Sequence, residues 1–274
     1  MIEIPESLTL AKQLTDTVKG KKIAEVETGH TKHSFAWYTD DPQEYAGKLQ
    51  GKTVGEIHGI GSMVEMEAED YRFTVGDGTN IRYFEKGEKL PERYQMRITF
   101  EDESSLICTV QMYGSMFLFR PGEYDNFYYL VAKEKPMPGT EGFDYPYFQS
   151  LKEELSGKLS AKAMLATEQR IPGLGNGVLQ DILLEAGIHP KQKIGSLREV
   201  DWKRLYTAVS NVLREMTEKG GRDTEKNLFG QAGGYRTKLS KKTLGGPCPY
   251  CGNPIQKTAY LGGTVYFCSQ CQRA

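Results

Sequence analysis

Four cysteines near the C-terminal end follow the spacing Cys248-x2-Cys251-x16-Cys268-x2-Cys271. Two Cys-x-x-Cys turns that face one another across a short hairpin can bring four thiolates around one tetrahedral zinc ion, with sulfur–zinc bonds of about 2.3 Å. Such a site is structural, because four sulfurs leave no coordination position for a substrate. The pattern therefore predicts a zinc (Zn2+) finger over residues 244–274, with these four cysteines as ligands.

The main alternative for the same cysteines is a pair of disulfide bonds. The 274-residue chain holds only five cysteines, and its first residues carry no secretory signal, whereas disulfide frameworks are typical of secreted chains. The composition therefore favours zinc. Cys108, the fifth cysteine, lies in an apolar segment of alternating pattern, where we expect a buried core residue rather than a nucleophile.

Positive and negative charges nearly cancel, with 35 lysines and arginines against 36 acidic residues and a net charge of −1. No segment has the length and apolarity of a membrane span, so we expect no membrane partner. A polyanion would have to bind a local basic patch rather than the field of the whole molecule. One Gly-rich segment offers such a patch, although a solvated loop would have the same composition. Its six basic residues are Arg222, Lys226, Arg236, Lys238, Lys241 and Lys242.

The N-terminal half, residues 1–135, predicts one opening helix followed by β-structure. Apolar residues repeat at helical spacing over residues 8–18. Residues 64–68, 95–100 and 106–110 instead alternate apolar and polar side chains, which is the period of strands with one buried face. Several such segments in succession favour an antiparallel β-sandwich or barrel.

The stretch Pro136-Met-Pro-Gly-Thr-Glu-Gly142 is the best candidate for a domain boundary, because its prolines and glycines interrupt regular structure. A short helix is predicted before it, over residues 126–133. Helical periodicity follows over residues 147–219, and we place a helical domain at residues 143–235. One apolar stripe in this region is predicted to be core and consists of Trp202, Leu205, Val209, Val212 and Met216.

A Gly-rich turn, Ile171-Pro-Gly-Leu-Gly-Asn-Gly177, is predicted to feed a helix that stops at Gly187. Asn176 stands where a helix N-cap is expected. Gly173 and Gly175 would let the backbone approach an anion, and the free N–H groups and positive dipole of a helix start favour phosphate. Many helix pairs, however, use glycine only to turn the chain.

The order of these parts is more specific than any one of them. Glu3-Ile-Pro-Glu6, a β-rich half, the Pro-Gly-Leu-Gly-Asn turn, the segment from Gly221 to Tyr235 and the four-cysteine finger follow one another along the chain. In this order they resemble the formamidopyrimidine-DNA glycosylase/endonuclease VIII family over essentially the whole length. The resemblance implies an α+β fold: an N-terminal antiparallel β-sandwich domain, and a C-terminal helix-two-turn-helix domain with a four-cysteine zinc finger. Damaged duplex DNA would cross the cleft between the domains.

Enzymes of this family excise an oxidised base and then cleave the abasic strand as lyases. The N-terminal proline amine, at the second position, attacks the sugar C1′ and forms a Schiff base, while a neighbouring glutamate handles protons. The resemblance therefore implies catalytic roles for Glu3, Glu6 and the α-amine of Ile2. Because methionine is normally removed only before small residues, we expect Met1 to remain, which displaces the amine by about 3.5 Å.

Other positions depart from the family pattern. Ser62 stands where a β-hairpin lysine is expected, and Gly263 where the finger carries a strand-breaking arginine. Asp77 falls near the intercalating methionine, and Gln111 or Met112 near the void-filling arginine. An acidic loop tip would be repelled by phosphates instead of entering the base stack.

Three hypotheses follow. The first is a DNA repair glycosylase with abasic-site lyase activity, acting through a noncanonical α-amine or through water activated by Glu3. The second is a nucleic-acid-binding protein on the same scaffold that has lost base release, and the third is a protein-interaction scaffold. We expect a cytoplasmic monomer that binds damaged or abasic duplex DNA. The predicted DNA contacts are Asn176, Gly173, Gly175, Arg222 and Lys238.

Overall fold

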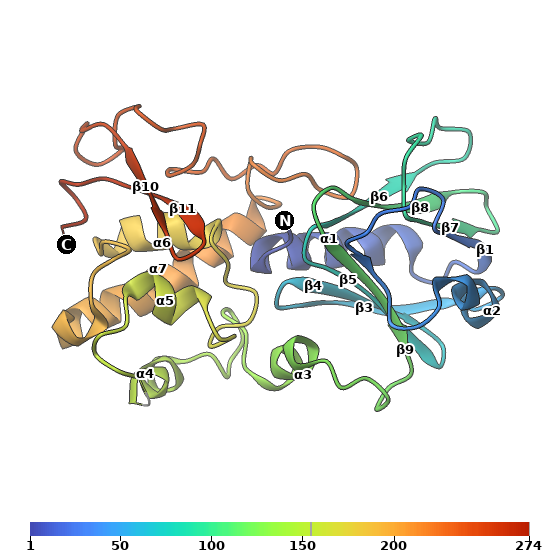
Figure 1. Ribbon diagram of the computed structural model, residues 1–274, viewed down its shortest axis with the longest axis horizontal. Helices are drawn as coiled ribbons and strands as arrows, with labels where there is room; N and C mark the ends of the chain where they lie inside the picture. Colours follow the sequence, from blue (N-terminus) through green and yellow to red (C-terminus); the bar gives the residue numbers. More distant parts are fainter. Residues whose placement is uncertain (154, 274) are drawn as a thin grey trace.

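The computed structural model describes residues 1–153 and 155–273 as two lobes, with helix α1 (Ile4–Val18) lying between them (Figure 1). The mixed α+β architecture predicted from the sequence is confirmed. The strands of the N-terminal lobe are β1 (Ile23–Thr28), β2 (Ala36–Trp37), β3 (Val54–Ile60), β4 (Met63–Ala68), β5 (Tyr71–Gly76), β6 (Thr79–Phe84), β7 (Met96–Phe100), β8 (Ser105–Val110) and β9 (Gly114–Phe119).

These strands form two sheets that enclose an apolar core. One sheet has the order β1-β7-β8-β6 and the other β2-β9-β5-β4-β3. All pairings within them are antiparallel except the short parallel contact between β2 and β9. Alternation decides which side chains face the core: Met96, Ile98 and Phe100 of β7 are buried. Cys108 is buried among them, as expected, and burial raises the pKa of its thiol to about 12.

The alternation of apolar and polar residues in β4 predicts that its polar side chains face solvent, but one of them does not. Glu65 is buried, because α3 (Phe127–Glu134) covers this side of the strand. The Tyr129 hydroxyl donates to the Glu65 carboxylate at 2.5 Å, and the Lys133 ammonium lies 3.0 Å from it. Helix α3 itself begins at the predicted place, with the Asn126 side chain accepting from the Tyr129 amide. Helix α3 is thus anchored to the sheet through the buried Glu65 carboxylate, which pairs with the partly exposed Lys133.

The C-terminal lobe is helical and ends in a small hairpin. Residues 136–142 form no helix or strand, in agreement with the predicted break. The predicted apolar stripe is buried along α7, and Gly187 ends α6 in a left-handed conformation with φ of 65°. The elements of this lobe are α4 (Tyr145–Glu153), α5 (Ala161–Ala166), α6 (Val178–Ala186), α7 (Glu199–Glu218), β10 (Gln256–Tyr260) and β11 (Gly263–Phe267), with a 3-10 turn at Ile194–Ser196. The N-terminal lobe also contains a 3-10 turn at Pro42–Glu44 and helix α2 (Tyr45–Leu49).

The buried apolar side chains form three clusters, one in each of the three segments expected from the sequence. The exact domain limits stay predictions. The first cluster fills the space between the sheets, the second lies among the helices, and the third surrounds the cysteines. Helix α1 joins the first two, because Leu10 and Leu14 pack in the β-lobe and Ile4 packs among the helices. Among the described residues, no helix combines the length and apolarity needed to cross a bilayer.

Candidate functional site

The anion at the start of α6 is a carboxylate of the chain itself. Glu3 accepts hydrogen bonds from the backbone N–H groups of Gly177 and Val178, both at 2.8 Å. These are free N–H groups of the first helical turn, at the positive end of the helix dipole. The predicted N-cap residue, Asn176, lies one position too early: α6 begins at Val178 with Gly177 as its N-cap, because Glu3 caps it from the other lobe.

The glycines of the turn are needed for close packing between the lobes. A Cβ on Gly173 would come within 2.2 Å of the Gly61 backbone, and Gly173 has a φ of +82°. A Cβ on Gly175 would lie 2.7 Å from the Glu3 carboxyl carbon, and one on Gly177 would overlap the Arg222 guanidinium at 1.6 Å. The close approach to an anion that the sequence predicts is therefore made inside the protein, where Gly175 leaves room for the Glu3 carboxylate.

Arg222 is the cation of a buried charge network. Its guanidinium donates to Glu6 through Nε at 2.9 Å and through a terminal nitrogen at 2.7 Å, and it lies 3.5 Å from Glu3. All three residues are at least 95% buried, with exposures of 2% for Arg222, 4% for Glu3 and 5% for Glu6. The structure thus places the predicted DNA contact Arg222 and both predicted catalytic glutamates in one network beneath the surface.

Burial and charge oppose one another in this network. Burial raises the pKa of Glu3, and the attraction of Arg222 counteracts that rise only in part. Burial also disfavours the charge on Arg222, but the negative potentials of Glu3 and Glu6 outweigh it and raise the pKa of Arg222. Arg222 therefore stays cationic, while burial makes Glu3 easier to protonate than an exposed glutamate.

The N-terminal amine lies at a cavity and contacts an acidic residue that the sequence reasoning missed. The Met1 ammonium is 2.5 Å from the Glu225 carboxylate, while Ile2 is buried and its backbone N–H donates to the Asp77 carbonyl at 3.3 Å. The cavity, of about 290 Å³, also exposes a second cation, Arg82, whose pKa burial lowers despite the nearby Glu225. Its further lining residues are Gly78, Asn80, Gln111, Met112, Tyr113, Thr224 and Lys226. The only sequence signal for Glu225 was its place in the segment resembling the family.

Asn176 is exposed where the turn meets the β10–β11 hairpin. Its amide Nδ2 donates to the Thr264 carbonyl at 3.0 Å. A Cβ on Gly263 would lie 3.4 Å from both Asn176 and the Lys162 ammonium, so Lys162 brings a cation to the position where the family's finger has an arginine. Lys162 is held by the Tyr260 carbonyl at 2.7 Å, and burial lowers its pKa. No sequence pattern indicated Lys162, because it lies far from the finger along the chain.

The predicted basic patch divides into exposed and paired residues. Lys238 pairs with Glu185 and lies 3.2 Å from the Tyr250 hydroxyl, so its charge is partly compensated. Lys242 pairs with Asp223 at 3.2 Å. Lys242 is nevertheless exposed, and the other exposed members of the patch are Lys226, Arg236 and Lys241.

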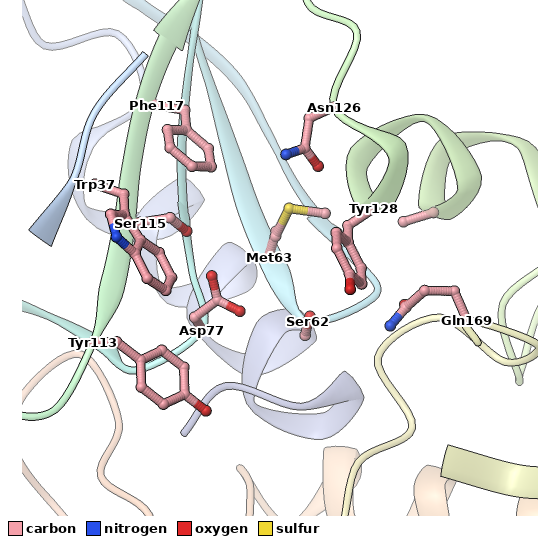
Figure 2. Close-up of a pocket in the computed structure, with 11 residues that line it drawn as sticks. Trp37, Ser62, Met63, Asp77, Tyr113, Ser115, Phe117, Asn126, Tyr128 and Gln169 are labelled. Atoms are coloured by element: carbon pink, nitrogen blue, oxygen red, sulfur yellow. The ribbon is translucent and has the colours of Figure 1, made fainter. Parts of the chain in front are cut away.

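Ser62 and Asp77, two positions where the chain departs from the family, line a second cavity of about 370 Å³ (Figure 2). Asp77 is only partly exposed, and its carboxylate lies among the lining side chains instead of at a solvated loop tip. Burial raises the pKa of this carboxyl, and a hydrogen bond from Ser115 counteracts the rise. Gln111 and Met112 are exposed in the turn before β9.

The four C-terminal cysteines form a cluster that fits a tetrahedral metal ion. All four Sγ atoms lie within 4.8 Å of one another, with 3.8 Å between Cys248 and Cys271 and 3.4 Å between Cys251 and Cys268. A tetrahedron with sulfur–zinc bonds of about 2.3 Å has edges of about 3.8 Å. The predicted ligand set is therefore assembled in one place, as the two facing turns required.

Sequence comparison with known proteins shows the family of this chain. A formamidopyrimidine-DNA glycosylase from Bacillus subtilis is 30% identical to this chain over 281 residues, which cover 99% of each protein. The chain belongs to the formamidopyrimidine-DNA glycosylase family. No family model matches it.

Solved structures of the family have the same fold. The MutM (Fpg) protein from Thermus thermophilus is 26% identical and superposes with a TM-score of 0.82, covering 98% of each chain. The Lactococcus lactis Fpg, solved in complex with DNA containing an abasic site, is 23% identical with a TM-score of 0.85 over 99% of this chain. The predicted family and the predicted fold class are both confirmed.

Proposed function

We propose that the protein is a DNA repair protein of the glycosylase and abasic-site lyase type, which binds damaged duplex DNA between its two lobes. The observation that carries this proposal is the full-length relationship to formamidopyrimidine-DNA glycosylases, combined with an N-terminal amine that borders a cavity. The fold is that of a relative solved with abasic DNA. A cytoplasmic, monomeric state remains part of the proposal.

The nucleophile in this proposal is the α-amine of Met1, since Ile2 is buried and its nitrogen is an amide when Met1 is retained. Attack on the C1′ aldehyde carbon of an opened abasic sugar requires a neutral amine, and Glu225, 2.5 Å away, is placed to accept its proton. Loss of water then gives the Schiff base. Arg82 and Lys226, which line the same cavity, would offset the charge of the neighbouring phosphates.

Duplex binding is assigned to the junction of the turn and the finger. Asn176 is exposed there beside Gly263, and its amide N–H can donate to a phosphate oxygen. Lys162 is buried next to Gly263, so it adds positive potential instead of a direct contact. The exposed Lys226, Arg236 and Lys241 extend this surface. We assign zinc to the four-thiolate cluster, because soft thiolate ligands in a closed tetrahedral set are typical of structural zinc.

A second function, binding of damaged DNA without base release, is favoured by the burial and the hydrogen bonding of Glu3. A general acid or base must reach the proton that it transfers, whereas Glu3 is buried and both its oxygens accept backbone N–H groups. In that case the cleft would bind a damaged duplex, and the Glu3–Arg222–Glu6 network would only hold the lobes together.

Borohydride trapping distinguishes the two functions. We expect the protein to form a covalent adduct with duplex DNA that contains an abasic site, because borohydride reduces the Schiff base to a stable amine. Peptide mass spectrometry should locate the adduct on Met1, and intact mass reads whether Met1 is present. Replacing Glu225 with glutamine should slow trapping by about 10²-fold or more, the range for loss of a proton acceptor. Salt-sensitive binding without any adduct would exclude the lyase and leave either a glycosylase without lyase activity or the damage binder; release of a damaged base would then distinguish these two.

Replacing Asn176 with alanine should weaken binding to an abasic duplex by about fivefold, or about 1 kcal/mol, the usual net value of one hydrogen bond. Fluorescence anisotropy at fixed salt measures the effect. Asn211→Ala is the matched control, because Asn211 is exposed on α7, which carries none of the site residues above. Equal affinities for the two variants would contradict the assignment of the turn to phosphate.

A further inference from the structure

Residues 222–235, which follow α7, form a strap that leaves the helical lobe and returns to it. The residues at its two ends, Arg222 and Tyr235, form a parallel β-bridge with one another. Each end is also held by a buried carboxylate, because Arg222 pairs with Glu6 and the Tyr235 hydroxyl donates to Asp181 at 3.0 Å. The strap is therefore closed at its base.

Contacts within the strap give it a defined shape. Lys226 and Ala232 form an antiparallel bridge between its two arms. At the tip, the Asn227 amide donates to the Gln231 carbonyl at 2.8 Å. The Asn227 side chain accepts from the amides of Phe229 and Gln231, both at 3.0 Å. Asparagine side chains that bond to nearby backbone N–H groups are typical of ordered turns, so the tip is a preformed element.

The tip of the strap is docked in the N-terminal lobe. Leu228 is fully buried, and it packs in the apolar cluster between the two sheets instead of the cluster among the helices. Its carbonyl accepts from the Tyr83 amide of β6 at 3.0 Å, and its amide donates to the Gln13 side chain of α1 at 3.0 Å. In Figure 1 the trace that follows α7 extends from the helical lobe towards β6. Leu228 thus fastens a segment of one lobe to the other.

The docked strap forms part of the wall around the N-terminal amine. Thr224, Glu225 and Lys226 line the cavity of about 290 Å³ from the strap. The other lining residues are Met1 and residues of β6, of the turn that precedes it and of the turn before β9. Glu225, whose carboxylate lies 2.5 Å from the Met1 ammonium, is three residues from Leu228. Since three residues span at most about 10 Å, release of the tip displaces Glu225 as well.

We propose that Leu228 is a positioning residue, whose insertion between the sheets holds the strap so that Glu225 meets the Met1 amine. The amine site is complete only while the strap is docked. Leu228 does not line the cavity, so it acts through Glu225 and not on DNA. Its effect on rate rests on the proposed role of Met1 as the nucleophile, whereas the placement of Glu225 does not. A displacement of about 1 Å in a reacting pair can cost about 10²-fold in rate.

Carbodiimide cross-linking tests the placement without DNA. The reagent activates the Glu225 carboxylate, and the Met1 amine then forms an amide bond with it only if the two groups are in contact. We expect the parent protein to give this linked peptide pair by mass spectrometry. Leu228→Ala should lower its yield at least about tenfold, because truncation of a buried leucine removes most of the docking free energy. Leu228→Met, which conserves the volume, should restore the yield.

Leu49→Ala is the matched control for Leu228→Ala. Leu49 is also fully buried in the cluster between the sheets, but it lies on α2 and not on the strap or β6. It should lose stability in the same way and keep the parent yield of the cross-link. A yield in Leu228→Ala equal to that of Leu49→Ala, or no recovery in Leu228→Met, overturns the proposal.

Hydrogen exchange at the Tyr83 amide reads the docking itself, because this amide donates to the Leu228 carbonyl. Its exchange should rise about tenfold or more in Leu228→Ala but not in Leu49→Ala. Gln13→Met removes only the side-chain acceptor of the Leu228 amide and should raise the same exchange about fivefold, the usual value of one hydrogen bond. This milder variant keeps the test decisive if Leu228→Ala does not fold. Parent-like exchange in both variants contradicts docking through Leu228.

Borohydride trapping then measures the consequence for the proposed chemistry. At saturating abasic duplex, so that rates and not affinities are compared, Leu228→Ala should react about tenfold more slowly than Leu49→Ala, or slower still. Equal rates would overturn the positioning role. A cross-link that depends on Leu228 in a protein that forms no adduct with DNA would support the strap and refute the lyase. Failure of the strap assignment and failure of the proposed function are therefore separate results.

Discussion

Replacing Arg222 with methionine should lower the free energy of unfolding by about 3–5 kcal/mol at neutral pH, the usual cost of removing one partner of a buried ion pair. Methionine fills much of the arginine volume but leaves Glu3 and Glu6 as uncompensated buried charges. Denaturant unfolding followed by circular dichroism measures the loss. The effect is large because Arg222 also contacts the α6 start, where Glu3 joins the two lobes.

The sign of the pH dependence follows from Glu3. Its pKa is already raised above the ordinary value of 4.5 in the folded protein, and removal of Arg222 should raise it further. The folded variant then binds the Glu3 proton more tightly than the unfolded chain does. Its stability therefore falls as the pH rises above the ordinary carboxyl pKa, where the unfolded chain has already released that proton. The difference between the variant and the parent should therefore shrink as the pH is lowered from neutral towards the ordinary carboxyl pKa.

Arg236→Met is the control for Arg222→Met, because Arg236 is an exposed arginine of the same segment. Its expected change in stability is within about 0.5 kcal/mol, as for most surface substitutions. A parent-like stability for Arg222→Met at neutral pH would show that the two glutamates are not ionised together in the folded protein. Adding Glu6→Gln should recover part of the loss, since it removes one of the two stranded charges.

Local patterns predicted most of the fold. The two-residue period at Met96, Ile98 and Phe100 and the cysteine spacing each depend on neighbours in sequence. The buried strand face and the clustering of the four cysteines are both confirmed. The partner that covers a face is not a local property. Glu65 alternates with apolar residues as a solvated side chain would, and only the return of α3 with Lys133 buries it.

The candidate site was less predictable for the same reason. The sequence indicated that an anion would lie at the turn containing Gly175, but the carboxylate found there comes from Glu3, far away along the chain. Arg222 belongs to a basic segment that the sequence predicts to be a surface patch, but it lies in the interior. Its two acidic partners, Glu3 and Glu6, are near the opposite end of the sequence, so no local pattern reveals the pairing. Residue types alone cannot tell whether a basic residue faces DNA or a buried glutamate.

Replacing Cys248 with serine should release the metal and unfold the finger. Structural zinc binding contributes apparent free energies of about 10–16 kcal/mol in zinc-finger peptides, so loss of one thiolate removes most of what orders this segment. The apolar cluster around the cysteines is small, with Leu184, Leu239 and Ile255 as its buried aliphatic members. It cannot replace the metal. Zinc content by plasma mass spectrometry should fall from about one to below about 0.1 ion per chain.

Cys108→Ser separates loss of a ligand from loss of a cysteine, because Cys108 is buried in the β-lobe core and should leave the zinc content unchanged. Full zinc content in Cys248→Ser would contradict the ligand assignment. The finger also positions the proposed phosphate contact: the Thr264 carbonyl accepts from Asn176, and Gln180 binds both Thr264 and Tyr266. Metal loss should therefore increase hydrogen exchange in β10 and β11 and weaken duplex binding at least as much as Asn176→Ala does. Unchanged duplex affinity after metal loss would place the DNA contacts on the remaining scaffold alone.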